Sequence, residues 1–320
     1  MTAPLALVIN PAAGGGRPAR HVPRVAAVLD ASGHRYTMRE TKSLEHARSL
    51  GTTAAQRGET LVAVGGDGLT GALASVAGTG LFGIIPAGRG NDFARALRIP
   101  FEPAAAARVL LDGRTAAVDL IAVTSGDPGG HRPRPPGRAG PGAGETPAAP
   151  VTVAGSFYIG ITSVAGEIAS TSRLVPGPLL YNMAALRALA GWKPTRFRVE
   201  AVSPGGRTAT HEFDGYTVVA ANSPYFGAGK KVAPDASVGD GLLDVVIMRH
   251  APKLTFLRAL TKVKDGSHVT LAQVSILRAE AVTVTVDRPL PAGADGETLG
   301  SGSPWHVRAL PAALNVIVPR

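Results

Sequence analysis

The sequence predicts an α/β domain followed by an antiparallel β-sandwich domain, because its pattern changes twice along the chain. Up to residue 123, short apolar runs alternate with longer amphipathic ones, as in a parallel sheet with crossover helices. Residues 124–150 are rich in proline and glycine and have little to bury, so we expect an insert without fixed structure. Later runs are of β type, with turns between them. The expected domains are 1–123 and 151–311, and residues 312–320 are expected to pack back on the first.

Strands and helices alternate in the first domain. Ser43 is a suitable N-cap for the second helix, and Gly58 is a suitable residue to follow its end. The expected strands are Leu5–Ile9, Arg35–Glu40, Leu61–Val64, Phe82–Ile85 and Val118–Val123. The expected helices are Pro18–Ala31, Ser43–Arg57, Leu69–Val76 and Pro103–Leu111.

The second domain is expected to be mainly β, with two helices at about Leu179–Gly191 and Lys253–Lys264. Its strands are predicted at Val151–Ile161, Arg196–Ser203, Thr208–Asp214, Tyr216–Asn222, Leu243–Met248, Val282–Val286 and Trp305–Ala309. A last run, Leu314–Val318, is the segment expected to return to the first domain. The alternative to an insert between two strands is that residues 124–150 form an interdomain linker.

Charge and composition restrict the kind of partner. Lys and Arg outnumber Asp and Glu by 33 to 23, and the net charge of +10 favours an anionic ligand or surface. Aromatic residues make up only 5% of the chain and interleave with no basic run, so nucleic acid is disfavoured. The absence of cysteine excludes disulfides and thiolate metal sites. The start resembles no secretory signal and no run of about 20 apolar residues occurs, so we expect a cytoplasmic protein.

Two glycine-rich turns are the most informative local feature. Gly65-Gly66-Asp67-Gly68 follows one expected strand, and Gly88-Arg89-Gly90-Asn91-Asp92 follows the next. The carboxyl ends of neighbouring parallel strands share one edge of a sheet, where open α/β sheets bind ligands. Without a Cβ, the glycines allow positive φ and bring backbone N–H groups against phosphate oxygens near a helix N-terminus. The pair predicts a nucleotide or phosphate site.

The side chains within these turns favour a functional site over a purely structural turn. Asp67 cannot bind phosphate favourably as an anion, so we expect it to hold a metal, a water or the loop. The second turn adds a guanidinium, an amide and a carboxylate in close succession, at Arg89, Asn91 and Asp92. A turn that only connects a strand to a helix does not require those groups.

Several further motifs, in order and spacing, resemble the catalytic family of diacylglycerol kinases, which includes bacterial members and eukaryotic sphingosine and ceramide kinases. The resemblance covers nearly the whole chain except the insert. The matching pieces are Asn10-Pro11 with Gly14; Thr41 with His46-Ala47; Gly65–Gly68; Pro86–Arg95; Val118-Asp119-Leu120; Asn222 with Gly227-Ala228-Gly229; Pro234-Asp235-Ala236 with Asp240–Asp244; and Asp295-Gly296-Glu297.

This resemblance implies a first domain like the nucleotide-binding unit of NAD kinases and phosphofructokinases, and a β-rich second domain with the lipid site. It implies that Asp67, Asp92 and Asp119 organise the catalytic Mg²⁺, partly through water. It also implies a set of residues that contact ATP from four segments of the first domain. These are Asn10, Thr41, Gly65, Gly66, Asp67, Gly68, Gly88, Arg89, Gly90, Asn91 and Asp92.

Two acidic segments of the second domain complete the predicted site. By the family pattern, Asp295 takes the proton from the acceptor hydroxyl and Glu297 supports it; an acidic hairpin turn is the structural alternative. The resemblance also implies a structural Mg²⁺ at Asp235, Asp240 and Leu242, in an oxygen-rich loop suited to a hard cation. An ordinary solvated turn is the alternative for that loop.

This chain departs from the family pattern directly after the first glycine turn and inside the second. The common continuation after the first glycine turn is Thr-Leu-Asn-Glu, whereas this chain has Leu69-Thr70-Gly71-Ala72. Arg89 stands where many members have threonine, and its guanidinium can pair with a phosphate bidentately. These departures leave the acceptor and the rate open.

The sequence therefore predicts an ATP-dependent lipid kinase that transfers the γ-phosphoryl group of MgATP to the hydroxyl of diacylglycerol or a related lipid. One alternative is a catalytically weakened homologue that binds nucleotide or lipid as a regulator. The other is an NAD kinase-like enzyme, since NAD kinases share the first glycine turn.

The two helices expected in the second domain are candidates for contact with a membrane. Basic residues flank apolar ones at helical spacing in the later helix, which favours either an ordinary solvated face or transient contact of a peripheral protein with an anionic membrane surface. The basic residues are Lys253, Arg258, Lys262 and Lys264. In the earlier helix, Leu179, Met183, Leu186 and Leu189 favour either core packing or the mouth of a lipid groove. The choice of lipid and the formation of a homodimer are left open.

Overall fold

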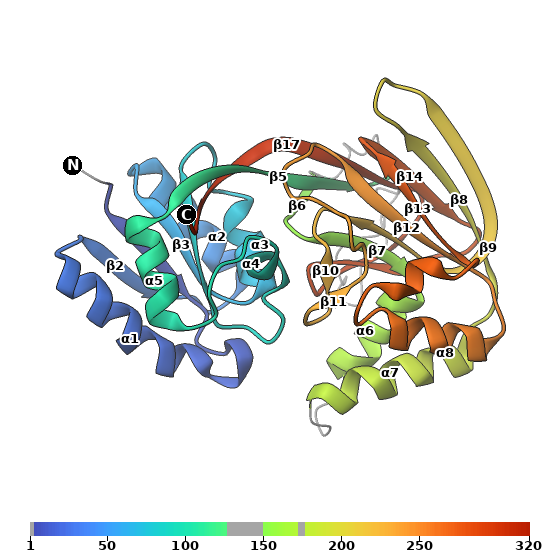
Figure 1. Cartoon of the computed structure of the whole chain (residues 1–320), viewed down its shortest axis with the longest axis horizontal. Coiled ribbons are helices and arrows are strands. Elements are labelled where there is room, and N and C mark those ends of the chain that lie inside the picture. Colours follow the sequence, from blue (N-terminus) through green and yellow to red (C-terminus); the bar gives the residue numbers. More distant parts are fainter. Residues whose placement is uncertain (1–2, 127–149, 172–176) are drawn as a thin grey trace, which may run out of the picture.

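The first lobe is a parallel sheet covered by helices on both faces (Figure 1). The computed structural model describes residues 3–126, 150–171 and 177–320. Four strands pair in the order β2–β1–β3–β4, all in parallel. These strands are β1 (Leu5–Ile9), β2 (Tyr36–Glu40), β3 (Thr60–Gly65) and β4 (Leu81–Pro86). The helices are α1 (Arg17–Ser32), α2 (Leu44–Gln56), α3 (Asp67–Ala74), α4 (Asp92–Ala96) and α5 (Pro103–Asp112), with a 3-10 turn η1 (Ala13–Gly15) after β1.

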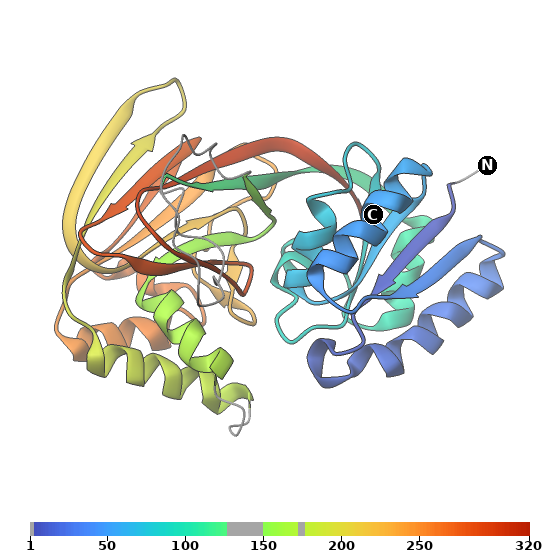
Figure 2. The same cartoon turned by 180° about the vertical axis from the view of Figure 1, so that it is seen from behind.

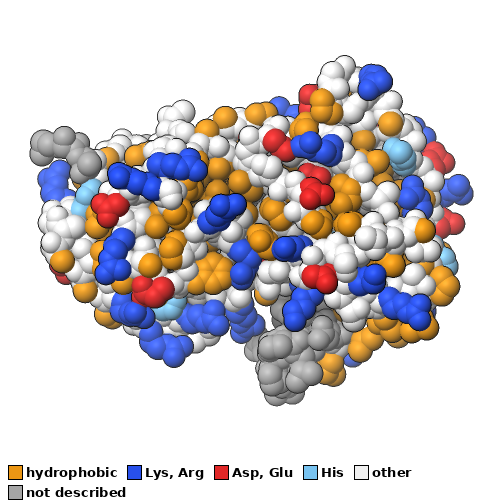
Figure 3. Space-filling model, viewed as in Figure 1, with side chains coloured by type: hydrophobic (Ala, Val, Ile, Leu, Met, Phe, Trp, Pro, Cys, Tyr) orange, Lys and Arg blue, Asp and Glu red, His pale blue; other side chains and the backbone are white. Residues whose placement is uncertain are grey.

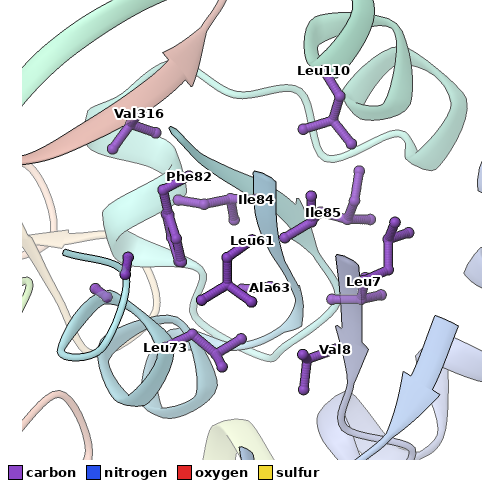
Figure 4. Packing of buried hydrophobic residues seen from close by; sticks show 14 of the residues in the cluster. Leu7, Val8, Leu61, Ala63, Leu73, Phe82, Ile84, Ile85, Leu110 and Val316 are labelled. Carbon is purple, nitrogen blue, oxygen red and sulfur yellow. The ribbon is translucent and has the colours of Figure 1, made fainter. Parts of the chain in front are cut away.

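Apolar side chains from both faces of this sheet form the core of the first lobe. Figure 4 shows Leu73 of α3 and Leu110 of α5 on opposite sides of the strands that carry Leu61 and Ile84. Burying one such side chain fully contributes about 1.5–3 kcal/mol. Strands β3 and β4, buried along nearly their whole length, therefore give a rigid base to the loops at their carboxyl ends.

The second lobe is built of antiparallel strands, in the order β16–β15–β7–β9–β8–β14–β17. Strand β12 pairs with both β9 and β13, and β5 pairs with both β17 and β6. A small separate hairpin consists of β10 and β11. These strands are β5 (Arg114–Ser125), β6 (Val151–Val153), β7 (Ser156–Gly160), β8 (Thr195–Val202), β9 (Thr208–Ala221), β10 (Tyr225–Phe226), β11 (Lys230–Lys231), β12 (Leu243–Arg249), β13 (Val274–Ala279), β14 (Ala281–Val286), β15 (Leu290–Ala294), β16 (Glu297–Gly302) and β17 (Trp305–Val318).

Two apolar clusters form the core of the second lobe. One lies between its sheet layers and includes Phe157, Phe197 and Trp305. The other lies between the sheet and a layer of helices, and includes Tyr216 and Phe256. The helices lie along one side of the lobe (Figure 1). They are α6 (Ile161–Thr171), α7 (Gly177–Gly191) and α8 (Lys253–Lys262), followed by the 3-10 turn η2 (Ser267–Thr270).

Two long strands, β5 and β17, connect the lobes, and both views show them arching from one to the other (Figures 1 and 2). They pair antiparallel from Trp305↔Ser125 to Val318↔Arg114. Beyond a register shift between Leu310 and Leu314, the end of β17 also pairs in parallel with β4, at Asn315↔Leu81. The sheet is therefore continuous between the lobes, and the boundaries at 123 and 151 stay predictions.

The predicted fold class is confirmed: an α/β lobe precedes an antiparallel β lobe. Within the described residues, none of the helices has both the length and the apolar character that a membrane span requires. Residues 127–149 of the expected insert and the side chain of Leu179 lie outside the described part of the chain. Several elements differ from expectation.

The prediction of separate strands at Thr208–Asp214 and Tyr216–Asn222 is wrong, because β9 runs through both. Asp214-Gly215 has the composition of a turn, yet Gly215 pairs with Thr195 in the ladder. A Cβ on Gly215 would lie 2.8 Å from the ring of Phe213, so the glycine serves close packing.

The predicted single strand Val151–Ile161 is instead two strands, interrupted at Ala154-Gly155, whose N–H groups bind the carboxylate of Asp295. The runs Trp305–Ala309 and Leu314–Val318 are two parts of the one strand β17. Elements that the pattern did not predict are η1, α4, α6, η2, β10, β11, β13, β15 and β16.

Candidate functional site

The two glycine turns meet at the carboxyl edge of the parallel sheet. Strands β3 and β4 are neighbours, with Gly65 opposite Pro86. The carbonyl oxygen of Gly65 accepts the N–H groups of Ala87 and Gly88, at 2.7 and 3.1 Å. A Cβ on Gly88 would overlap the Cα of Gly66, so only glycine permits this approach. The structure thus brings Gly65, Gly66 and Gly68 together with Gly88 and Gly90.

Asn91 lies inside the second turn and binds the turn itself. Its Oδ1 accepts the N–H of Gly88 at 2.8 Å, and its Nδ2 donates to the carbonyl of Gly88 at 3.2 Å. Asn91 has a φ of 53°, in the left-handed region that asparagine tolerates better than most residues. Arg17 adds a hydrogen bond from Nη1 to the same carbonyl at 2.6 Å. These side chains fix the backbone of the turn, while the exposed Arg89 extends from it to the wall of a cavity.

Asn10 and Thr41 lie at the same edge, after β1 and β2, and both bind their own loops. Oδ1 of Asn10 accepts the N–H of Ala12 at 3.1 Å, and Oγ1 of Thr41 donates to the carbonyl of Ser43 at 2.6 Å. A third glycine segment, which contains Gly14 and follows β1, also lies at this edge. A Cβ on Gly14 would lie 2.5 Å from the carbonyl oxygen of Ala87, so Gly14 contacts the second glycine turn.

Asp67 and Asp92 are close enough to affect each other's charge. Asp67 begins α3, and its Oδ1 accepts the N–H of Phe93 at 3.1 Å. Burial raises the pKa of Asp67 to about 6, and the negative charge of Asp92 adds to this effect. Burial also raises the pKa of Asp92 above its ordinary value. A cation would be favourable beside two buried carboxylates of this kind.

Asp92 also connects the two lobes. Its Oδ1 accepts the N–H of Gly229 at 2.7 Å, and its Oδ2 accepts the N–H of Ala228 at 3.0 Å. Both residues have positive φ, 88° and 66°, which presents their N–H groups on one side. The carboxylate therefore holds the turn between β10 and β11 against the second glycine turn.

Asp295 faces the first lobe from the turn between β15 and β16. Its carboxylate accepts the N–H groups of Ala154, Gly155 and Ser156, at 2.8 to 3.2 Å. These bonds favour the ionised form, but burial outweighs them and raises the pKa of Asp295 to about 7. A proton acceptor with a pKa near the working pH suits general base catalysis.

Small residues of α3 allow this close approach of the second lobe. A Cβ on Gly71 would lie 3.1 Å from Oδ2 of Asp295, and a Cβ on Gly68 would lie 3.0 Å from Oε1 of Glu297. Gly71, which departs from the family pattern, thus lies directly against Asp295.

Asp119 does not join Asp67 and Asp92 at the cavity, although the resemblance grouped the three around one metal. Its Oδ1 accepts the N–H of Ala312 at 2.8 Å, and its Oδ2 accepts the N–H of Gly241 at 2.7 Å. With 2% of its surface exposed, Asp119 connects β5 to the bend of β17 and to the acidic loop. Its observed contacts are structural, and a role in binding metal stays a prediction.

The acidic loop after Pro234 is held partly by an ion pair. Asp240 pairs with Arg278 of β13, and its Oδ1 accepts the N–H of Leu242 at 3.1 Å. Asp235 is exposed, whereas Asp244 is buried, and within the described part of the chain its Oδ2 has no hydrogen-bond partner. Burial raises the pKa of Asp244, and Arg278 opposes that rise. Asp244 is thus a buried carboxylate beside this loop. Within the described residues no group of three or more His, Cys, Asp or Glu side chains could hold a metal ion, and the structural Mg²⁺ at Asp235, Asp240 and Leu242 stays a prediction.

A cavity of about 560 Å³ connects Asp67, Asp92 and Asp295 with the interior of the second lobe. Its polar end is lined by Asp67, Arg89, Asp92, Lys230 and Asp295. Its other end is mainly apolar, with lining residues from β7, β9, β12, α6, α8 and β13. These include Tyr158, Ile161, Val219, Val246, Met248, Phe256, Val263 and Val274. Carboxylates and cations thus lie at one end of an apolar chamber.

Two residues of the site had no assigned role in the sequence. Asn222 donates from Nδ2 to the carbonyls of Asp119 and Ala154, at 2.8 and 2.9 Å, and so supports the segment that binds Asp295. The sequence signal for Asn222 is its position in the family motif with Gly227-Ala228-Gly229. Lys230 lines the cavity while its neighbour Lys231 is exposed, and nothing in the sequence distinguishes the two.

Comparison with known families matches both lobes. Residues 4–123 match the diacylglycerol kinase catalytic domain, and residues 155–318 match the YegS C-terminal NAD kinase beta sandwich-like domain. A diacylglycerol kinase of Mycobacterium tuberculosis is 34% identical over 281 residues, which cover 86% of this chain and 82% of that protein. A diacylglycerol kinase of Bacillus subtilis is 25% identical over 326 residues, which cover 98% and 96% of the two chains.

A solved structure shares the fold. The crystal structure of a putative diacylglycerol kinase from Bacillus anthracis superposes with a TM-score of 0.73 at 20% identity, covering 98% of this chain and 97% of the other. The family matches together span both lobes, and they show that the chain belongs to the diacylglycerol kinase catalytic family and is a lipid kinase.

Proposed function

We propose that this lipid kinase transfers the γ-phosphoryl group of ATP to the hydroxyl of diacylglycerol or a closely related neutral lipid. The observation that carries the proposal is a cavity lined both by polar groups and by apolar side chains of the second lobe. The polar groups are Asp67, Arg89 and Asp92 of the two glycine turns, together with Asp295. A phosphoryl donor and a lipid acceptor need such a shared space, because phosphoryl transfer requires the two to be positioned in line.

The glycine turns are the proposed phosphate site. Close contact between Gly66 and Gly88 joins the two turns into one surface, and Arg89, which lines the cavity, adds a positive charge that suits a phosphate. Asn10, Thr41 and Asn91 bind their own loops in this structure, so their proposed role is to shape the turns that contact ATP. The remaining glycines of both turns are proposed to contact ATP through their backbone.

Asp67 and Asp92 fit a magnesium ion. Burial raises the pKa of both carboxyl groups, so a bound cation would favour their ionised forms. No cluster of three or more acidic or histidine side chains in the described residues could hold a metal alone. The pair of carboxylates, Asp67 and Asp92, suits Mg²⁺, because this ion is commonly held by one or two carboxylates together with phosphate oxygens and water. When bound, Mg²⁺ supplies positive charge to the phosphate oxygens.

Asp295 is proposed to take the proton of the lipid hydroxyl. Its carboxylate lines the cavity, is fixed by three backbone N–H groups and has a pKa of about 7. The exposed carboxylate of Glu297, against Gly68, is proposed to support the approach of the two lobes.

The surface beside the chamber is proposed to meet an anionic membrane transiently. Met183 and Leu186 of α7 are 55% and 51% exposed, and Leu254 of α8 is 62% exposed. Leu260 is also partly exposed and lines the cavity. Figure 3 shows orange side chains beside blue ones along the lower right edge, where Figure 1 places α7 and α8. Apolar side chains with basic neighbours at a cavity mouth suit the entry of a lipid from a bilayer.

The test is a panel of acceptors in mixed micelles with γ-labelled ATP and Mg²⁺. The panel holds diacylglycerol, monoacylglycerol, sphingosine, ceramide, undecaprenol and, for the alternative enzyme, NAD. Labelled phosphatidate is the expected product. Labelled NADP would support the NAD kinase alternative, and nucleotide binding without any labelled product would support the regulatory one.

A further inference from the structure

Lys230 is a cation at the polar end of the cavity that the proposed function has not used. It lies in β11, where Phe226 pairs with Lys230 and Tyr225 with Lys231. Because side chains alternate along a strand, the two lysines face opposite ways. Lys230 lines the cavity and is partly buried, whereas Lys231 is exposed.

The backbone beside Lys230 is fixed to the phosphate-binding lobe. Gly229 precedes it, and the N–H of Gly229 binds Asp92 at 2.7 Å. Arg95 lies beneath that glycine, since a Cβ on Gly229 would be 3.2 Å from the Arg95 guanidinium carbon. Arg95 in turn stacks on Phe101 and Tyr225, with its guanidinium carbon 4.7 and 5.7 Å from their ring centres. Lys230 is thereby held close to the second glycine turn even though it belongs to the other lobe.

The charge of Lys230 is not neutralised by a direct partner. Across the described residues, no ion pair within 4.0 Å involves its ammonium group. Burial lowers the pKa of Lys230, and the more distant Asp92 partly offsets this. A half-buried cation is costly without an anionic partner. The cavity that it lines is also where a phosphoryl group would pass between the glycine turns and Asp295.

We propose that Lys230 binds the phosphoryl group during its transfer and the phosphomonoester of the lipid product, together with Arg89, which lines the same cavity. This rests on the proposed function. The bond between the γ-phosphorus and its bridging oxygen breaks as the lipid oxygen bonds to that phosphorus. The hydroxyl proton passes to Asp295, and Lys230 keeps its own proton throughout. Its ammonium group neutralises charge on the phosphoryl oxygens, which adds to transition-state stabilisation.

The test compares Lys230→Met with Lys231→Met, a matched change on the opposite face of the same strand. Lys230→Met is expected to lower kcat by at least about tenfold, with the KM for ATP within about twofold of the unsubstituted protein. It is also expected to weaken inhibition by phosphatidate about tenfold. Lys231→Met is expected to leave all three values unchanged, and Lys230→Arg to restore part of kcat.

Each outcome separates this inference from the proposed function. If the unsubstituted protein phosphorylates no lipid of the panel, the proposed function and this inference both fall. If it is active and Lys230→Met matches it in kcat and in phosphatidate inhibition, only the Lys230 inference falls. Thermal unfolding checks the fold, and Lys230→Gln replaces the Met variant if that variant unfolds.

Discussion

Gly88 and Gly66 come from two different turns, yet they lie so close together that a Cβ on Gly88 would overlap the Cα of Gly66. It would also lie 2.9 Å from Oδ1 of Asn91, the atom that accepts the N–H of Gly88. The phosphate site proposed here is therefore one composite of two turns, and its shape depends on the absence of two methyl groups.

Gly88→Ala is expected to push these turns apart. Overpacking of this kind costs about 1–3 kcal/mol, and the displaced N–H groups should weaken ATP binding by at least about tenfold. Calorimetric titration with ATP and thermal unfolding measure the two effects. Gly191→Ala is the control, since a Cβ there meets open space. Equal ATP affinity in both variants would show that the contact does not shape the site.

Asp92→Ala is expected to release the turn that carries Ala228 and Gly229. Two hydrogen bonds to an ionised acceptor are lost, so the free energy of unfolding should fall by about 2–4 kcal/mol even with Mg²⁺ removed by a chelator. Chemical denaturation in the chelator measures this. Asp287→Ala, at an exposed position, is the control. A loss of stability seen only when Mg²⁺ is present would mean that Asp92 acts through the metal alone.

Asn222→Ala is expected to destabilise the junction between β5 and the segment that binds Asp295. The carbonyls of Asp119 and Ala154 each lose a buried hydrogen bond, which costs about 1–3 kcal/mol apiece. The value of kcat should fall by more than the loss of folded protein explains, because the segment that binds Asp295 is no longer held by Asn222. Hydrogen exchange of residues 154–156 and kcat measure this, and unchanged exchange would contradict it.

The rate of transfer is expected to rise with pH through the pKa of Asp295, about 7. The active form is the ionised carboxylate, since it must accept a proton. Below that pKa the ionised fraction, and with it kcat, should fall by about tenfold per pH unit. A kcat profile from pH 5.5 to 8.5 at saturating substrates measures this. A profile that is flat between pH 6 and 8 would mean that another group takes the proton or that the proton step does not limit the rate.

The first lobe could be predicted from the sequence because its signals are local. Buried strands such as Leu61–Val64 end at glycines, and neighbouring parallel strands necessarily present their loops at one edge. The second lobe is less predictable, because Asp214-Gly215 has the composition of a turn, yet Gly215 pairs with Thr195 of β8 and with Arg249 of β12. A Cβ on Gly215 would also lie 2.9 Å from the carbonyl oxygen of Met248. These long-range contacts, which no local pattern encodes, keep β9 continuous.

The predicted site residues also differ in whether local motifs or long-range contacts determine their positions. Family motifs named Asp67, Asp92 and Asp295, and all three line one cavity. They also named Asp119, whose contacts with Gly241 and Ala312 depend on how β17 returns through the molecule. The position of Lys230 depends on which of two adjacent lysines faces inward, and a strand of two residues gives no pattern from which to choose.

The central claim is that Asp295 accepts the proton of a lipid hydroxyl beside ATP bound at the glycine turns. Transfer of label from γ-labelled ATP to diacylglycerol by Asp295→Asn, with ATP affinity and thermal unfolding measured on the same sample, tests it most directly. The account predicts kcat lower by about 10²–10⁴-fold with ATP affinity within about twofold, because the substitution removes the base and leaves the turns intact. A folded Asp295→Asn protein that makes phosphatidate at the unsubstituted rate would contradict it.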